Sequence, residues 1–277
     1  MSNWLITGVN AGLGNALAEA ALARGDTVAG TVRTLGALAA FEALAPGRSL
    51  GFLLDVTDEM AVRKVAEKAE AATGGLDVLV NNAGYGLVGA VEEASLAEVR
   101  AQFEVNLFGP IAMIQAVLPF MRARRAGRIV NITSVSGVAA WAGTGIYCAS
   151  KYALEGVAQT LAQEVAELGV KVINVEPGGM RTDYAGRSLH QTQRIIDDYD
   201  GAARFARRIL AEHAGHEPGD PAKVAAAILK VVDAENPPLQ LLLGADALHY
   251  ATRQLARVQA EIGEWASLTM STSFDEG

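Results

Sequence analysis

Tyr147 and Lys151 form the pair in this chain that is best suited to acid–base chemistry. They stand four positions apart in a segment with a helical pattern, so their side chains project from one helix face. A neighbouring ammonium lowers the pKa of a tyrosine, ordinarily about 10, because it favours the phenolate. Lowering it by about three units needs roughly 4 kcal/mol, which an exposed lysine does not supply. The pair therefore predicts a desolvated proton-transfer site, in which the hydroxyl of Ser134 can orient a substrate oxygen.

A glycine-rich turn lies near the amino terminus, over Thr7-Gly8-Val9-Asn10-Ala11-Gly12-Leu13-Gly14. It follows an apolar run and precedes a helical pattern. Glycines permit a tight turn and let backbone N–H groups approach a pyrophosphate at the start of the helix. The turn alone is compatible with a plain strand-to-helix connection. Its place in the first strand–helix unit favours dinucleotide binding.

Short β-rich runs and longer helical patterns alternate along the chain. Most of the short runs are apolar throughout, as expected for parallel strands covered on both faces. The alternation predicts an α/β fold, with a doubly wound Rossmann-type sheet of about seven parallel strands flanked by helices on both faces. The expected strands are 4–7, 27–32, 50–54, 77–80, 128–133, 170–175 and 239–243, and the expected helices are 13–24, 58–73, 96–122, 145–168 and 221–234.

No linker, repeat or low-complexity segment divides the sequence, which predicts a single domain over residues 1–277. Residues 183–219 break the regular alternation, because they are polar, show no strand pattern and end in Pro218-Gly219. A long insertion after a strand, on the ligand side of such a sheet, is more often a lid than a separate domain. We expect this segment to cover a substrate.

Composition narrows the classes of function. A net charge of −8 argues against a nucleic-acid partner, which needs a clustered positive surface. The apolar region 105–121 is interrupted by polar residues and prolines, so no membrane span is expected. A single cysteine, Cys148, cannot form an intramolecular disulfide and fits a reducing compartment, the cytoplasm. The spacing of His213 and His216 in a loop does not predict a metal site.

The order and spacing of these motifs resemble the short-chain dehydrogenase/reductase family, in its compact single-domain branch. The glycine turn has the family's Thr-Gly-x-x-x-Gly-x-Gly spacing, which differs from the common Gly-x-Gly-x-x-Gly. The resemblance covers nearly the whole chain and loses definition after about residue 183. The further matches are Asn81-Asn82-Ala83-Gly84 after the fourth strand, Asn106 in the next helix, Ser134, Tyr147 and Lys151 in catalytic order, and Pro177-Gly178 after the sixth strand.

The resemblance implies a catalytic set of Asn106, Ser134, Tyr147 and Lys151. Lys151 would also hold the nicotinamide ribose, and Asn106 would anchor a water that links the lysine to solvent. Asn106 could instead mark a distortion of its helix near Pro110, because asparagine is a poor helix former. The residues implied for cofactor binding are Gly8, Asn10, Gly12, Leu13, Gly14, Arg33, Asp55, Val56, Asn82, Ala83, Gly84, Tyr147, Lys151, Pro177, Gly178 and Thr182.

The end of the second strand bears on the choice of cofactor. NAD-specific sites place a carboxylate here for the adenosine ribose, but this chain has Val32, followed by Arg33. A guanidinium can bind a 2′-phosphate bidentately, and Asn10 could add a donor. The sequence therefore favours NADP(H) over NAD(H). Asp55 resembles the family's contact to the adenine amino group, and its rival interpretation is helix capping near Thr57.

The family's geometry also implies an apolar substrate pocket that contains Trp141, Met180 and Tyr184. Such a pocket suits a lipophilic ketone, aldehyde or secondary alcohol, although ordinary core packing would give a similar set of residues. The end of the second strand and the turn at residues 81–86 resemble the subgroup that includes 17β-hydroxysteroid and retinol dehydrogenases. No metal is required, because the tyrosine supplies the acid.

The expected function is that of an NADP(H)-dependent oxidoreductase that acts on a small-molecule carbonyl or alcohol, with Tyr147 as general acid and base. Two alternatives share the fold. An epimerase or dehydratase usually carries a longer carboxyl-terminal domain and a different glycine turn, and a non-catalytic NADP(H)-sensing protein could dispense with Tyr147 and Lys151. The resemblance further implies a homodimer or homotetramer that pairs through helices 96–122 and 145–168.

Overall fold

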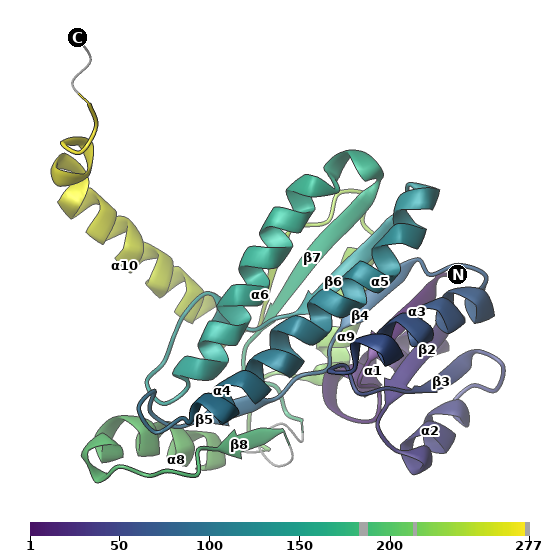
Figure 1. Ribbon diagram of the computed structural model, residues 1–277, viewed down its shortest axis with the longest axis horizontal. Coiled ribbons are helices and arrows are strands. Elements are labelled where there is room, and N and C mark those ends of the chain that lie inside the picture. Colours follow the sequence, from purple (N-terminus) through teal and green to yellow (C-terminus); the bar gives the residue numbers. More distant parts are fainter. Residues whose placement is uncertain (183–187, 213–214, 275–277) are drawn as a thin grey trace.

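A seven-stranded parallel sheet forms the centre of the protein in the computed structural model, which describes residues 1–182, 188–212 and 215–274. The strand order is β3-β2-β1-β4-β6-β7-β9, and the sheet is flanked by helices (Figure 1). The predicted doubly wound sheet is thereby confirmed. Its strands are β1 (Asn3–Thr7), β2 (Thr27–Val32), β3 (Ser49–Leu53), β4 (Val78–Asn81), β6 (Gly127–Ile132), β7 (Val170–Pro177) and β9 (Gln240–Leu243).

Helices occupy the connections between the strands, and each helix expected from the sequence has a counterpart within a few residues. The expected helix 96–122 consists of two α-helices joined by a π-helical turn. The α-helices are α1 (Gly12–Ala23), α2 (Leu35–Glu42), α3 (Glu59–Thr73), α4 (Leu96–Phe103), α5 (Gly109–Arg124), α6 (Gly145–Glu164), α8 (Phe205–Glu212), α9 (Pro221–Val232) and α10 (Ala245–Met270). Of these, α2, α8 and α10 were not expected.

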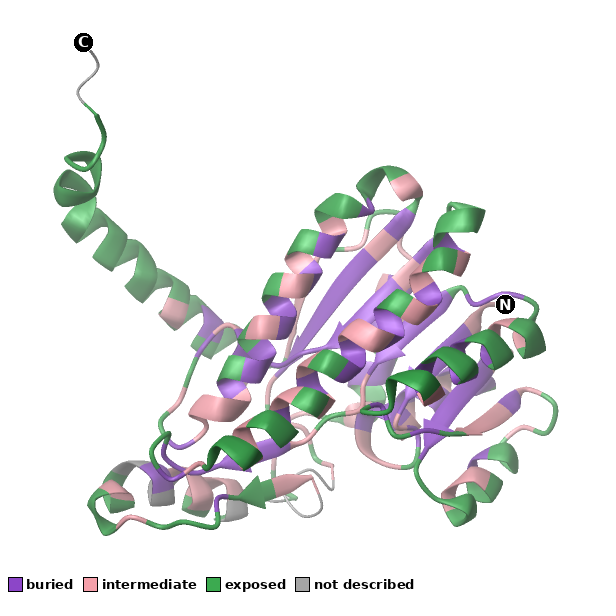
Figure 2. Ribbon diagram, in the orientation of Figure 1, coloured by how far each residue is buried: buried purple, intermediate pink, exposed green. Residues whose placement is uncertain are grey.

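Two apolar cores lie on the two faces of the sheet, because successive side chains of a strand point to opposite faces. In β1, Trp4 and Ile6 pack in one core with α1 and α9, and Leu5 packs in the other with α3, α5 and α6. All three side chains are fully buried. Figure 2 shows the strands as a largely buried layer between helices whose outer sides are exposed. Burial on both faces explains why these strands are apolar throughout.

Several helices begin where a short polar side chain accepts hydrogen bonds from the free N–H groups of the first turn. Asp58 caps α3 in this way, and Ser95 forms a capping box with Glu98 at the start of α4. Asp220 caps α9, and Pro221 occupies its first turn. These local signals place the starts of three helices that cover the sheet or line its carboxyl edge.

The run Leu96–Arg124 is the segment among the described residues that is long and apolar enough to cross a membrane by length and composition. The apolar side chains of this run serve the core of the protein, because Met113, Val117 and Met121 are fully buried against the sheet. The run is interrupted by the π-helical turn η1 (Glu104–Phe108), which contains Asn106. The alternative interpretation of Asn106, a distortion before Pro110, thus describes the local backbone correctly.

The segment after β7 does contain regular structure, so the prediction that residues 183–219 carry no strand was wrong. Strand β8 (Leu189–Gln191) pairs in parallel with β5 (Gly86–Val88), and α8 follows it. Three residues are too few to give a strand pattern, and the backbone of β5 supplies the partner that they need. The segment is therefore joined to the loop after β4 by backbone hydrogen bonds.

Helix α10 extends away from the rest of the protein (Figure 1). Only its first turns are anchored, where Ala247 and Ala251 are fully buried and Trp141 meets the ring of Tyr250 edge to face at 5.3 Å. Beyond them the helix is exposed, including the large side chains Leu255 and Trp265. The sequence analysis assigned no helix here.

Candidate active site

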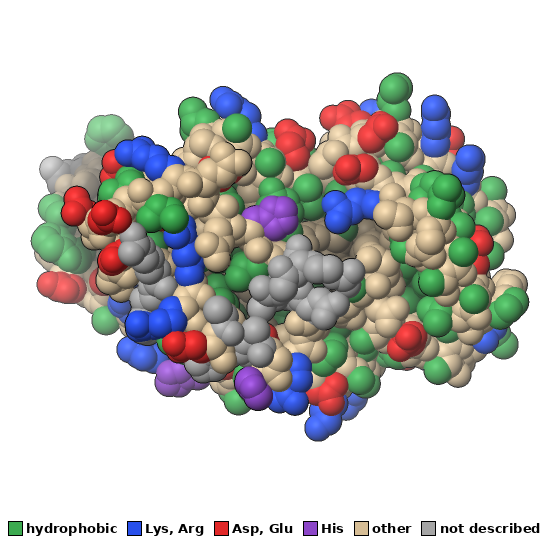
Figure 3. Space-filling model, turned by 90° about the horizontal axis from the view of Figure 1, so that it is seen from below, with side chains coloured by type: hydrophobic (Ala, Val, Ile, Leu, Met, Phe, Trp, Pro, Cys, Tyr) green, Lys and Arg blue, Asp and Glu red, His purple; other side chains and the backbone are tan. Residues whose placement is uncertain are grey.

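The predicted catalytic residues and the glycine turn lie at the carboxyl edge of the sheet, around the ends of β1 and β4. Strand order runs outward in opposite directions from this pair, which makes the crevice between their ends the usual ligand position in an open α/β sheet. Figure 3 shows the side of the molecule on which β5, β8 and α8 lie. Acidic and basic side chains are interspersed on that face, without a continuous basic surface.

The glycine turn adopts a conformation that other residues would strain. Gly8 and Gly12 have φ angles of 74° and 58°, in the left-handed region that glycine adopts without cost. A Cβ on Gly14 would lie 2.3 Å from the carbonyl oxygen of Gly8, so no side chain fits there. The turn thus leaves backbone N–H groups of α1 open at its first turn, where a pyrophosphate is stabilised. This geometry fits the predicted dinucleotide.

Asn82 holds the glycine turn in place. Its Nδ2 donates hydrogen bonds to the carbonyl oxygens of Thr7 at 2.8 Å and Gly8 at 3.1 Å. The backbone N–H groups of Asn82 and Ala83 both donate to the hydroxyl of Thr7 at 2.9 Å. The two motifs at residues 7–14 and 81–84 therefore form one rigid unit. The side chains of Leu13 and Val56 are buried in the cores, so these residues offer a cofactor only their backbones.

Lys151 is buried beneath Tyr147 on α6. Its Nζ lies 5.8 Å from the centroid of the Tyr147 ring and donates a hydrogen bond of 2.9 Å to the carbonyl oxygen of Ile132. The lysine is 6% exposed, and burial lowers its pKa to about 8, because removal from water disfavours the ammonium. Ser134 lies just after the end of β6, and its hydroxyl accepts the N–H of Ser136 at 3.0 Å. The predicted desolvated environment is present.

Asn106 reaches the same region from the π-helical turn. Its Oδ1 accepts the backbone N–H of Tyr85 at 3.1 Å, and its Nδ2 donates to the carbonyl oxygen of Tyr85 at 2.9 Å. A Cβ on Gly84 would lie 3.1 Å from Oδ1 of Asn106 and 3.7 Å from Nζ of Lys151. Gly84 therefore keeps open the space above the lysine, and the π-turn brings Asn106 to its border.

Arg33 lies at the rim of a cavity of about 490 Å³ beyond the end of β2. The neighbouring Val32 is 2% exposed and belongs to the core, so it offers the cavity no polar group. Asn10 and Thr34 also line the cavity, and none of the described residues that line it is a carboxylate. The cavity is lined by Val9, Asn10, Asn15, Arg33, Thr34, Ala37, Ala40, Phe41 and Leu44.

Asp55 lies near Arg33 and forms a turn with Thr57. Its Oδ1 accepts the backbone N–H of Thr57 at 3.0 Å and the hydroxyl of Thr57 at 2.8 Å. These bonds, followed by the charge of Arg33, lower the pKa of the Asp55 carboxyl. The cap of α3 is Asp58 rather than Asp55, so helix capping does not account for Asp55.

The loop after β7 approaches the glycine turn from the other side. A Cβ on Gly12 would lie 3.7 Å from Thr182, which places Thr182 over the turn. Asp246, at the start of α10, accepts the backbone N–H of Gly179 at 2.7 Å and leaves no room for a side chain at Gly178. Sequence reasoning missed Asp246, because nothing local indicates that a residue about 70 positions away supports the Pro177-Gly178 turn.

The predicted pocket residues are only partly brought together. Trp141 packs with α10 against Tyr250 and is half-buried. Met180 packs against the core of α1 and α9 and forms a backbone bridge with Gly219. Tyr184 lies outside the described residues. Tyr85 adds an aromatic ring from the other side of the site, 4.7 Å from the ring of His190 on β8.

The arrangement can hold a dinucleotide across the carboxyl edge and move a proton at Tyr147. Across the described part of the chain, no cluster of three or more His, Cys, Asp or Glu side chains could hold a metal. A buried acid that sequence reasoning also missed is Glu155, one helical turn beyond Lys151. Its spacing of four residues from the lysine was the signal that could have identified it.

Comparison with characterised proteins agrees with this geometry. The family model described as short chain dehydrogenase matches residues 2–193. The oxidoreductase BOA17 of Botryotinia fuckeliana is 36% identical over 98% of both chains. The 3-ketodihydrosphingosine reductase of Bacteroides thetaiotaomicron is 37% identical over 87% of both chains. Retinol dehydrogenase 8 of Bos taurus is 37% identical over 85% of this chain and 79% of its own.

Solved structures give the same result. A short-chain dehydrogenase from Streptomyces avermitilis superposes with a TM-score of 0.92 at 43% identity, covering 99% of this chain and all of its own. A short-chain dehydrogenase/reductase from Burkholderia phymatum in complex with NAD has a TM-score of 0.83 at 25% identity, covering 94% of this chain and 95% of its own. ElxO with NADP bound has a TM-score of 0.74 at 26% identity, covering 90% and 99%. The chain therefore belongs to the short-chain dehydrogenase family and is an oxidoreductase.

Proposed function

We propose that the protein is an NADP(H)-dependent oxidoreductase that acts on a lipophilic ketone, aldehyde or secondary alcohol, with Tyr147 as general acid and base. The observation that carries this proposal is the burial of Lys151 beneath Tyr147, 5.8 Å from its ring centroid, at the edge of the sheet where the glycine turn lies. When bound, the nicotinamide supplies or accepts the hydride at the carbon of the reacting C–O bond.

Tyr147 handles the proton of the reaction. In reduction its hydroxyl donates a proton to the substrate oxygen, and in oxidation its phenolate accepts one. The Lys151 ammonium favours the phenolate, and its effect is large because water is excluded around it. Ser134 orients the substrate oxygen, and Asn106 anchors a water that links Lys151 to solvent.

The preference for NADP(H) is supported by the cavity at the end of β2. Arg33 and Asn10 can donate hydrogen bonds to a 2′-phosphate, and the lining residues that the structure describes include no carboxylate that would repel it. Asp55, close to Arg33 but not in the lining, is free of a helix-capping role and is assigned to the adenine amino group. Of the similar structures described above, one holds NADP and another holds NAD. The cofactor preference of this chain therefore depends on the side chains that line its own cavity.

The lipophilic character of the substrate is supported by the apolar and aromatic groups on the site's outer side, Tyr85, Trp141 and Met180. Two relatives are named for retinol and 3-ketodihydrosphingosine, which are both largely apolar molecules. The segment 183–219 is proposed as the lid over this pocket, and β8 attaches it to β5. Tyr184 stays a predicted pocket residue.

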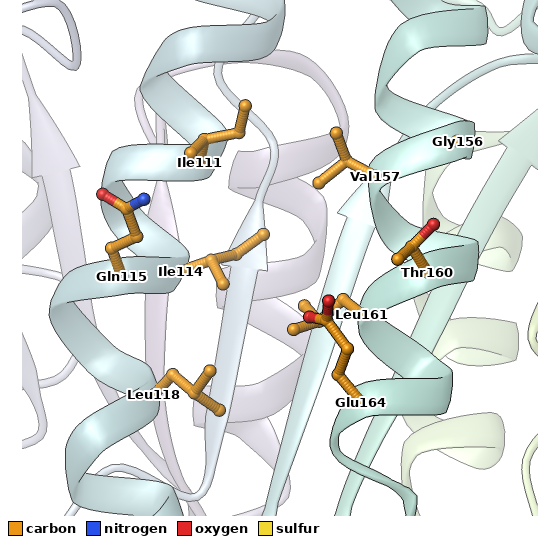
Figure 4. Close-up of a pocket in the computed structure, with 9 residues that line it drawn as sticks. All are labelled: Ile111, Ile114, Gln115, Leu118, Gly156, Val157, Thr160, Leu161 and Glu164. Atoms are coloured by element: carbon orange, nitrogen blue, oxygen red, sulfur yellow. The ribbon is translucent and has the colours of Figure 1, made fainter.

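We further propose that two copies of the chain pair through α5 and α6. A cavity of about 530 Å³ lies between these helices, and Ile114, Leu118, Val157 and Leu161 point toward one another across it (Figure 4). This face suits a two-fold dimer, in which the same patch meets itself. A cytoplasmic location stays a prediction.

The proposal is tested by replacing Tyr147 with phenylalanine, which removes the proton-transferring hydroxyl and keeps the ring. We expect Tyr147→Phe to lower kcat for NADPH-dependent reduction of a panel of aryl and cyclic ketones by at least about 10²-fold. The measurement is NADPH absorbance, with NADPH binding followed separately by fluorescence. Tyr152→Phe, a half-exposed tyrosine on the same helix, is the matched control.

The outcomes separate the candidate functions. Loss of turnover with intact NADPH binding supports the proposal, and undiminished turnover contradicts it. Binding of NADPH by the wild-type protein without turnover of any carbonyl would favour a sensing protein. A nucleotide retained through purification and unchanged during conversion of a substrate would favour an epimerase or dehydratase.

A further inference from the structure

Three buried asparagine side chains form a hydrogen-bonded chain across the sheet that ends on Glu155 of α6. Asn81 of β4, Asn131 of β6 and Asn174 of β7 stand opposite one another in register. Nδ2 of Asn81 donates to Oδ1 of Asn131 at 2.9 Å, and Nδ2 of Asn131 donates to Oδ1 of Asn174 at 3.1 Å. Nδ2 of Asn174 then donates to Oε2 of Glu155 at 2.6 Å.

The direction of these hydrogen bonds favours a negative charge on Glu155. Every amide donates toward Glu155, so the three side-chain dipoles present their positive ends to its carboxylate. The asparagines and Glu155 are each at most 3% exposed, and hydrogen bonds in such surroundings polarise one another. An N–H donor to an ionised oxygen forms a shorter and stronger bond than one to a neutral oxygen.

A second carboxyl group, that of Glu176 on β7, lies close to Glu155 and tends to keep its proton. Burial and the charge of Glu155 raise the pKa of Glu176 to about 7. Oε1 of Glu155 has no amide or hydroxyl donor among the described residues. The protonated carboxyl of Glu176 donates a hydrogen bond to Glu155 instead. Gln240 donates to Glu176 at 3.0 Å. When Glu176 holds its proton, the negative charge of the pair is on Glu155.

Lys151 lies one helical turn before Glu155, where side chains of the same helix face are neighbours. Both side chains extend from α6 to the sheet, Lys151 to Ile132 of β6 and Glu155 to Asn174 of β7. A Cβ on Gly137 would lie 2.9 Å from Cγ of Glu155 and 3.3 Å from the carbonyl oxygen of Lys151. The turn that contains Gly137 therefore packs closely over both residues, and little water can screen their charges.

Among the described residues, few other ionisable groups lie in the region around this lysine. On α6 these are Tyr147 and the buried thiol of Cys148, which lies 3.3 Å from the hydroxyl of Thr144. From β7 it is Glu176, and the carboxylate of Asp246 on α10 is engaged by Gly179. The side chains that β4, β6 and the π-turn bring to this region are the neutral amides of Asn81, Asn131 and Asn106. Within the described chain, Glu155 is the anion whose charge opposes the effect of burial on Lys151.

We propose that Glu155 is a positioning residue for Lys151. The three asparagines fix the ionised carboxylate of Glu155, and its charge keeps the buried lysine protonated at the pH at which the enzyme works. The inference rests on the proposed function, in which Lys151 acts as an ammonium. Without the carboxylate, the lysine would release its proton at a lower pH, because burial alone disfavours its charged form.

The direct test is a titration of Lys151 by NMR, in protein labelled with ¹³C at lysine Cε and without cofactor. The chain has six lysines, and Lys151→Arg identifies the signal. Glu155→Gln removes the charge but keeps an oxygen that can accept from Asn174. We expect a wild-type midpoint of about 8 and a midpoint about one to two units lower in Glu155→Gln.

Two control variants separate charge from structure. Glu155→Asp keeps the carboxylate and is expected to restore most of the wild-type midpoint. Glu167→Gln removes an exposed acid just beyond α6 and is expected to leave the midpoint unchanged. A wild-type midpoint in Glu155→Gln would overturn the proposal. Should that variant not fold, a ¹³C carboxyl signal showing Glu155 protonated at pH 7 in the wild-type protein would overturn it as well.

The pH profile of activity adds a readout that loss of stability would not move. In NADPH-dependent reduction, the alkaline limb of kcat/KM is expected to move down with the Lys151 midpoint, because Lys151 has to carry its proton. At pH 6 at least about half of Lys151 still carries its proton in Glu155→Gln, so kcat/KM is expected to fall there by no more than about twofold. If no carbonyl is turned over, the proposed function fails, while the titration still decides the role of Glu155.

Discussion

Neighbouring residues at the end of β2 have opposite environments, and the proposed preference for NADP(H) depends on this difference. Val32 is 2% exposed in the core, whereas Arg33 lines the cavity that also contains Asn10. Strand geometry causes this alternation, because successive side chains point to opposite faces. Arg33 is therefore the side chain whose loss should change cofactor preference.

We expect Arg33→Ala to raise the KM for NADPH about tenfold or more and to leave the KM for NADH nearly unchanged. A charged hydrogen bond to a phosphate contributes about 1.5–3 kcal/mol, and NADH has no 2′-phosphate to receive it. Initial rates with both cofactors provide the measurement. Arg253→Ala, an exposed arginine on α10, is the matched control. An equal rise for both cofactors would contradict the assignment.

At the scale of elements, short irregular pieces position the site more than the long helices do. The π-turn before α5 brings Asn106 to Tyr85, and the three-residue strand β8 attaches the proposed lid to β5. An ion pair at the lid adds to this attachment. Arg207 of α8 lies 3.4 Å from Glu93, whose side chain is 1% exposed, and donates to the hydroxyl of Thr192 at 2.8 Å. Hydrogen bonds that involve a charged group are the stronger ones in a protein, so this contact should help to hold the segment.

We expect Arg207→Met to loosen residues 188–212 from the rest of the protein without unfolding the sheet. The variant loses the charge-assisted hydrogen bonds from Arg207, which contribute about 1.5–3 kcal/mol, so amide hydrogen exchange there should be at least about tenfold faster. Arg208→Met, which removes an exposed partner of Glu212, is the control. Identical exchange in the Arg207→Met and wild-type proteins would show that this ion pair does not hold the segment.

At the scale of the whole molecule, α10 divides into an anchored base and an exposed arm. The base carries Asp246, which supports the Pro177-Gly178 turn, and the buried Ala247 and Ala251. The arm carries Leu255, which is 59% exposed, and Trp265, which is 58% exposed. The base should therefore contribute much more than the arm to the free energy of unfolding of the single chain.

Deleting residues 259–277 is expected to leave the thermal unfolding midpoint within about 2 °C, because exposed residues contribute little to stability. Deleting residues 246–277 removes the base as well and is expected to lower the midpoint by several degrees and to weaken NADPH binding. Differential scanning fluorimetry and NADPH titration provide the measurements. A large loss from the shorter deletion would show that another surface, such as a second copy of the chain, covers the arm.

The sequence itself predicted the main sheet, its parallel strands and most of the helices that cover it, because these depend on local apolar patterns. It also predicted Tyr147 above Lys151, since residues four apart on a helix must share a face. The glycine turn was equally local, because only glycine adopts the backbone angles of Gly8 and Gly12 without strain.

Tertiary structure decided what depends on contacts between distant segments. The lysine becomes chemically unusual only when β6 and the turn after it bury it, and the charge of Glu155 becomes important only when three strands align their asparagines. Asp246 supports a turn about 70 residues away, and β8 exists because β5 lies beside it. Sequence patterns determine which side chains share an element, whereas burial and long-range pairing determine the electrostatics of the site.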